Sequence, residues 1–196
     1  MLLALDKTGN RIKATPTARA VCDGCKGIVR AHCGALRQWH WHHEKADCDP
    51  WREPETEWHL DWKAKFPEEC CEVWESPHRA DVRNPSGLVI EFQHSSISTL
   101  EIQEREAFWK NLVWVFDARE WFVNFDIRLR PDKITFRWKH PRTSLFFARR
   151  PIFLDTGTVM FQLTWLSQKV PCGGTGRFIP YQYFIRSMLH FRGRDE

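Results

Sequence analysis

The pattern of apolar and polar positions in this 196-residue chain predicts a mixture of helices and short strands. Trp58, Trp62 and Phe66 recur four residues apart, which is the spacing of one face of an amphipathic helix over 55–66, and Pro67 ends that helix. Residues 112–116 are apolar throughout, as in a strand that is buried on both faces and runs parallel to its neighbours. Other short strands are expected at 72–74, 79–82, 88–93, 134–138, 151–154 and 159–165.

Turn and cap signals connect these elements. Asn84 to Gly87 predicts a turn before the strand at 88–93, and Ser98 followed by Glu101 is a capping box that predicts a helix over 99–111. A last helix is expected over 181–191, and the glycine-rich segment 173–176 is expected to be a loop. Strands on both sides of a crossover helix predict an α/β fold, with a mixed β-sheet flanked by helices.

Composition narrows the class of protein. The chain is 42% hydrophobic and 28% charged, which excludes a disordered chain, a collagen and a coiled coil. Its net charge of +4 permits a polyanionic partner without requiring one. No apolar run approaches the ~20 residues of a membrane helix, and the apolar start at 1–5 is too short for a signal peptide. We therefore expect a soluble, cytoplasmic protein without a membrane partner.

The segment 1–52 has the composition of a small domain held by metal. Cys22 and Cys25, with two residues between them, are followed by His40 and His43 with the same spacing. Two thiolates and two imidazoles from two close pairs satisfy tetrahedral zinc. Alternatives for the fourth ligand are His42, Cys33 and Cys48. The sequence thus predicts a structural Zn²⁺ knuckle, against the plain alternative of scattered thiols and surface histidines without an ion.

A second group of candidate metal-binding residues supplies oxygen atoms as ligands. Asp81 lies in one expected strand, and Glu91 and Gln93 lie in the next, where residues two apart point to the same face. Converging carboxylates are expensive to bury unless a cation compensates them, and magnesium prefers such ligands. The plain alternative is a structural one, in which Asp81 caps its hairpin and Glu91 pairs with Arg79 across strands.

An acidic residue, a turn and then acid-x-Gln on the next strand resemble the PD-(D/E)XK nuclease superfamily, which has lysine in place of Gln93. More narrowly, 79–82, 90–98 and the following Glu101, Arg105 and Trp109 are similar to the competence protein CoiA family. The Cys-x2-Cys pair, the histidines at 40–43 and Glu57-Trp58-His59 fit the same family, so the resemblance covers about 22–116.

This resemblance implies a restriction-endonuclease-like domain over 53–196 that uses Mg²⁺ or Mn²⁺ to hydrolyse DNA during competence, recombination or defence. It makes Asp81 and Glu91 metal ligands, with Glu57 completing the acidic cluster. Gln93 can hold a water but brings no charge, so Arg105 is the candidate for the missing positive charge, and the water activator stays open. Strandedness, a homo-oligomeric state and partners in a DNA-processing complex stay open too. The alternative function is a non-catalytic, zinc-containing nucleic-acid-binding module.

Overall fold

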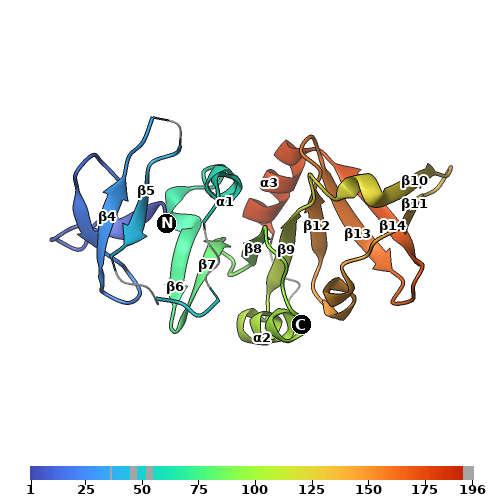
Figure 1. Ribbon diagram of the computed structural model, residues 1–196, viewed down its shortest axis with the longest axis horizontal. Coiled ribbons are helices and arrows are strands. Elements are labelled where there is room, and N and C mark those ends of the chain that lie inside the picture. The colour runs from blue at the N-terminus through green and yellow to red at the C-terminus, as the bar shows by residue number, and fades with distance from the viewer. Residues whose placement is uncertain (36, 45–47, 52–54, 192–196) are drawn as a thin grey trace. The chain divides into compact units, whose positions relative to one another are not determined.

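The computed structural model describes residues 1–35, 37–44, 48–51 and 55–191. The chain divides into two compact units, Met1–Arg83 and Asn84–Glu196, whose elements are labelled in Figure 1. The domain boundary expected between residues 52 and 53 falls outside the described residues and stays a prediction. No described helix has the length and apolar character needed to cross a membrane.

The first unit begins with an antiparallel sheet of strand order β2-β1-β3-β4-β5. Its strands are β1 (Leu3–Leu5), β2 (Arg11–Lys13), β3 (Arg19–Val21), β4 (Ile28–His32) and β5 (His40–His43). One face covers a small core in which Val29 and Trp41 are the most buried large side chains and most other members are alanine or cysteine. Such a core is too small to stabilise a sheet of short strands alone, as the composition predicts.

The same unit continues with a helix and a hairpin. Helix α1 (Glu57–Lys63) is followed by the 3₁₀ turn η1 (Glu68–Cys70) and by the antiparallel strands β6 (Cys71–Glu75) and β7 (His78–Arg83). Trp58 and Trp62 are at most 5% exposed, which confirms that they mark the buried face of a helix, whereas Phe66 is equally buried but lies after the helix, which is shorter than the expected 55–66.

The second unit is a mixed sheet of strand order β10-β11-β14-β13-β12-β9-β8. Strands β8, β9 and β12 are mutually parallel, and the other pairs are antiparallel. The strands are β8 (Val89–Gln93), β9 (Leu112–Asp117), β10 (Phe125–Leu129), β11 (Ile134–Trp138), β12 (Ile152–Asp155), β13 (Met160–Leu166) and β14 (Cys172–Ile179). Strand β9 is buried along its whole length between two parallel neighbours, as its continuous apolar run predicts.

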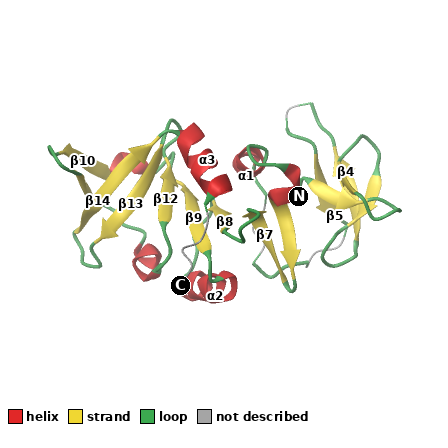
Figure 2. Cartoon of the chain, turned by 180° about the vertical axis from the view of Figure 1, so that it is seen from behind, coloured by secondary structure: helices red, strands yellow, loops and turns green. Residues whose placement is uncertain are grey.

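The helices α2 (Thr99–Trp109) and α3 (Tyr181–His190) lie beside these strands in Figures 1 and 2. Register places Glu91, Trp114 and Ile152 on one face of the sheet, and α2 contacts that face through ion pairs and hydrogen bonds to the first two. The ring of Phe184 in α3 lies 4.9 Å from that of Phe153, which occupies the opposite face. The unit is therefore a three-layer α/β arrangement, with the 3₁₀ turns η2 (Phe122–Asn124) and η3 (Thr143–Phe147) in its connections.

The expected loop at 173–176 is wrong, because these residues lie inside β14. A Cβ atom on Gly174 would collide with the ring of Phe136, and one on Gly176 with the ring of Phe161. Glycine is therefore used here for close approach of an aromatic ring rather than for flexibility. The expectation failed because glycine in a strand and glycine in a loop look alike in sequence.

Candidate metal centre and nuclease site

A cluster of three cysteines and one histidine lies at the end of the first unit's sheet. The candidate ligand atoms of Cys22, Cys25, His43 and Cys48 all lie within 4.8 Å of one another. Sγ of Cys22 is 3.5 Å from Sγ of Cys48, and Sγ of Cys25 is 3.5 Å from Nε2 of His43. Ligands at ~2.3 Å from a tetrahedral zinc stand ~3.7 Å apart, so the cluster could hold a zinc ion.

The electrostatics of the thiols agree with a cation site. Burial and the hydrogen bond with Cys22 raise the pKa of the Cys48 thiol to about 12. For Cys22 and Cys25, hydrogen bonds from neighbouring groups outweigh burial and lower the pKa. Three thiols in one small volume cannot all ionise cheaply without a cation, and a divalent ion removes that penalty.

The expectation that His40 is the fourth ligand is wrong, and Cys48 takes that place. Both histidines lie in β5, where side chains alternate between faces, so residues three apart point to opposite sides of the sheet. His43 is buried toward the core, whereas Nδ1 of His40 lies 3.0 Å from the Gln38 carbonyl and its ring lies 5.5 Å from that of His32. A strand prediction over 40–43 would have excluded His40 and His43 as a ligand pair.

Two of the expected acidic residues belong to the first unit. Glu57 is exposed at the first position of α1, and Asp81 is half-buried in β7. Two basic residues, Lys63 and Arg79, lie near Asp81. Burial alone would lower the pKa of each, but nearby carboxylates, Asp81 among them, raise both values.

The other expected residues belong to the second unit, where Glu91 is buried in β8. Its Oε2 accepts a hydrogen bond from Nη1 of Arg105 at 2.9 Å, and Nη2 of the same guanidinium pairs with Glu101 one turn earlier in α2. The Arg105 side chain is 5% exposed. Its positive charge is therefore directed at Glu91 and fixes the orientation of that carboxylate, while its contact with phosphate stays a prediction.

Gln93 adds a second oxygen to the same face of β8. Its Nε2 donates to the Ser95 carbonyl at 3.3 Å, which turns the amide oxygen the other way. That Oε1 is buried and accepts no hydrogen bond from any residue that the structure describes. A buried acceptor without a donor is costly, and a hard cation or a cation-bound water would satisfy it. The donor set of Glu91 and Gln93 therefore fits a divalent metal.

Sequence reasoning missed a dyad at the carboxyl end of the parallel strands. His94 follows β8, and its Nδ1 donates to Oδ2 of Asp117, the last residue of β9, at 2.8 Å. Arg119 binds both oxygens of the same carboxylate, and although burial raises the pKa of Asp117, these hydrogen bonds lower it overall. Ligands of open α/β sheets bind beyond this edge. The available sequence signal was the position of Asp117 directly after the apolar run at 112–116.

Asp81 and Glu91 lie in different units. Searches against protein-family models, curated proteins and solved structures find no match to this chain.

Proposed function

We propose that the chain is a metal-dependent DNA nuclease whose metal is held at β8. The observation that carries this proposal is the pairing of the Glu91 carboxylate with the donorless Oε1 of Gln93 on one buried face. The local order of elements supports it, since β7 carries Asp81, a turn with Gly87 at φ 84° follows, and β8 carries Glu91 and Gln93. The resemblance to CoiA-like proteins makes Asp81 and Glu57 candidate ligands of Mg²⁺ or Mn²⁺ as well.

The residues of β8 and α2 have distinct roles in this proposal. When bound, the metal polarises the phosphoryl oxygen and lowers the pKa of its water. Glu91 supplies a carboxylate ligand that Arg105 keeps in one orientation. Gln93 holds a water molecule or the metal through its amide oxygen, but it brings no charge.

His94 supplies the proton acceptor that glutamine at position 93 cannot be. A histidine whose Nδ1–H is held by a buried carboxylate has its Nε2 fixed as the basic nitrogen, which is the arrangement of an oriented general base. The side chain of His94 is 39% exposed, so water can reach it, whereas that of Asp117 is 6% exposed. We assign water activation to His94 and its orientation to Asp117.

The Cys3His cluster has a structural role in the same proposal. Four protein ligands leave no open position on zinc, so a bound Zn²⁺ would do no chemistry and would hold the turn after β3 to β5. The second candidate function, a non-catalytic zinc-containing DNA-binding module, uses this cluster but not Glu91, Gln93 and His94.

A cleavage assay with matched variants separates the two functions. Single- and double-stranded DNA are incubated with wild type, Asp81→Asn and His94→Gln, with and without added Mg²⁺ or Mn²⁺. Chelators are avoided because they would also remove zinc. We expect metal-dependent cleavage by wild type and at least a hundredfold loss in each variant. Asp61→Asn, which changes an exposed carboxylate in α1, is the control and should cleave normally.

Metal binding is measured separately, by titration of Mn²⁺ with wild type and with Glu91→Gln whose fold is verified by circular dichroism. The nuclease proposal predicts a weaker Mn²⁺ site in the variant. Equal DNA binding by all variants without cleavage would refute the proposal and favour the binding module.

A further inference from the structure

The second unit contains a pocket of about 450 Å³ where the chain entering β12 separates from β13. Strands β12 and β13 pair from Ile152 and Leu163 onward, and Thr164 to Leu166 then continue against β14 alone. The space beside this continuation is bounded on the other side by η3 and the residues that follow it. Its volume is that of a site for a small organic group.

The charged residues that line the pocket are both basic. Arg149 and Arg150 line the pocket, and no acidic residue does so. Both arginines are exposed, and neither guanidinium has an ion-pair partner among residues 1–35, 37–44, 48–51 and 55–191. Exposed guanidinium groups without an ion-pair partner are suited to bidentate recognition of phosphate.

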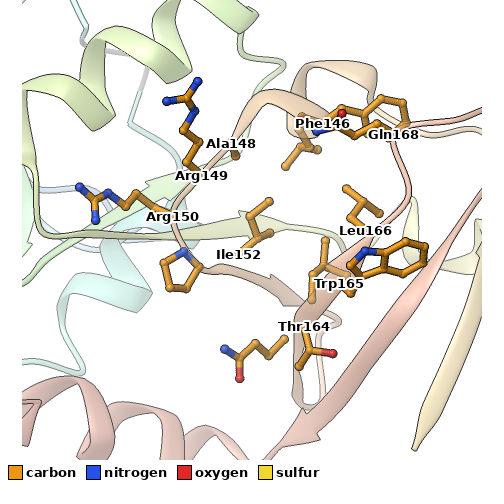
Figure 3. A pocket seen from close by; sticks show the side chains of 13 residues that line it. Phe146, Ala148, Arg149, Arg150, Ile152, Thr164, Trp165, Leu166 and Gln168 are labelled. Atoms are coloured by element: carbon orange, nitrogen blue, oxygen red, sulfur yellow. Dashed lines mark hydrogen bonds between the residues drawn. The ribbon is translucent and has the colours of Figure 1, made fainter. Parts of the chain in front are cut away.

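An aromatic side chain stands opposite the arginines. Figure 3 shows Trp165 at one end of the pocket and Arg149 and Arg150 at the other, with Ile152 between them and the two guanidinium groups extending outward from the pocket. The Trp165 side chain is 60% exposed, so its indole has a face open to solvent. A large exposed indole lowers solubility. Stacking on a nucleic-acid base is a function that accounts for its exposure.

We propose that this pocket holds one nucleotide of a DNA single strand, with the base on Trp165 and the flanking phosphates on Arg149 and Arg150. Single-stranded sites combine basic groups that follow the backbone with aromatic groups on which bases stack. A base that is paired and stacked in a duplex cannot enter such a pocket, because neither face of its ring is free to stack on an indole. The inference rests on the proposed function and deepens it by selecting single-stranded DNA as the substrate.

The site is held in place by a buried carboxylate. Glu106 in α2 is 8% exposed and accepts hydrogen bonds from the backbone N–H of Arg149 at 3.0 Å and of Arg150 at 3.1 Å. The indole N–H of Trp114 binds the same carboxylate at 3.0 Å. The backbone that carries the two arginines is thus fixed to α2, which positions their side chains at the rim.

The test is binding of fluorescein-labelled dT15 by anisotropy, without added magnesium or manganese so that no cleavage occurs. Trp165→Ala should weaken binding by about tenfold, and Trp165→Phe should restore most of it because a ring remains. Arg149→Gln with Arg150→Gln should reduce the slope of log K against log[salt] by about 1.4, which is the loss of two phosphate contacts.

Matched controls lie on α3, which covers the other face of the sheet. Tyr183→Ala removes a ring that is also 60% exposed, and Arg186→Gln removes one exposed positive charge. Both should bind dT15 like wild type. Equal loss in pocket and control variants, or equal affinity for dT15 and a DNA duplex, would overturn the inference, as would a preference for the RNA oligonucleotide rU15.

Failure of this inference is distinguishable from failure of the proposed function. Unchanged binding by Trp165→Ala in a protein that cleaves DNA rejects the pocket alone. Pocket-dependent binding of dT15 by a protein that never cleaves supports the pocket and rejects the nuclease.

Discussion

Glu72 is a buried carboxylate in an unusual backbone conformation, with φ at 53° and 2% of its surface exposed. It accepts hydrogen bonds from the N–H groups of Leu2 and Leu3 and from Nζ of Lys63 at 2.7 Å. The pairing in β6 passes from Cys71 to Val73 and leaves Glu72 outside the ladder. The conformation is therefore tolerated because it aims a carboxylate at donors that would otherwise be buried without an acceptor.

The charge of Glu72 makes the stability of the first unit depend on pH. Burial alone would raise the pKa of Glu72, but Lys63 and Arg79 outweigh it and set the pKa to about 2. A depressed pKa stabilises the folded state above the unfolded value of ~4.3, and that stability is lost as the pH falls toward 2. Glu72→Gln should cost about 3 kcal/mol at pH 7, because it leaves Lys63 short of a partner.

Urea unfolding followed by circular dichroism at several pH values measures the effect. The difference in free energy of unfolding between wild type and Glu72→Gln should shrink from pH 5 to pH 2. Glu69→Gln, at an exposed position in η1, controls for the loss of one carboxylate. A difference that stays constant with pH would contradict the assignment.

At the scale of elements, helix α2 joins the site to the pocket. Its N-terminus is capped by Ser98, whose side chain accepts a hydrogen bond from the Glu101 N–H at 3.1 Å. One face of the helix carries Arg105, which holds Glu91, and the next residue is Glu106, which holds the pocket backbone. Ser98 is thus confirmed as the N-cap, but the Glu101 carboxylate pairs with Arg105 rather than completing a capping box, and the helix positions two functional regions.

Loss of the Ser98 N-cap should therefore lower the stability of the protein. Ser98→Ala removes one acceptor for the free N–H groups of the first turn and should lower the free energy of unfolding by about 1 kcal/mol. Ser96→Ala, two residues earlier and also exposed, should change it by less than ~0.5 kcal/mol. Guanidinium denaturation of both variants provides the measurement, and equal values for the two would show that the cap contributes nothing.

At the scale of the whole molecule, the two units differ in what stabilises them. The sheet of the second unit is covered on both faces, with Trp114, Leu154 and Phe161 fully buried. The sheet of the first unit covers a core rich in alanine and cysteine. A core that small needs a further constraint, and a metal at Cys22, Cys25, His43 and Cys48 would supply it.

Zinc removal should consequently affect one unit. Hydrogen exchange followed by mass spectrometry should show faster exchange in 1–44 after chelation or in Cys48→Ser, with 84–191 unchanged. Cys33→Ser, at the rejected ligand position, should keep both its zinc content and its exchange rates. Equal zinc in Cys48→Ser and wild type would exclude Cys48 as a ligand.

Local patterns determined the elements that depend on short-range physics. The helical spacing of Trp58 and Trp62, the N-cap at Ser98 and the apolar run at 112–116 each follow from a period or a single hydrogen bond. The ligand pair Cys22 and Cys25 was equally clear, because a two-residue spacing brings both thiols to one point in a turn.

Tertiary structure decided whatever depends on which side of a strand a residue faces and on which strands meet. It selected Cys48 over His40, because alternation in β5 sends His40 away from His43. It joined His94 to Asp117 across two parallel strands separated by a helix, and it placed Arg149 opposite Trp165. Sequence alone cannot yield such pairings, because strand order and register are set by packing of the whole sheet rather than by neighbouring residues.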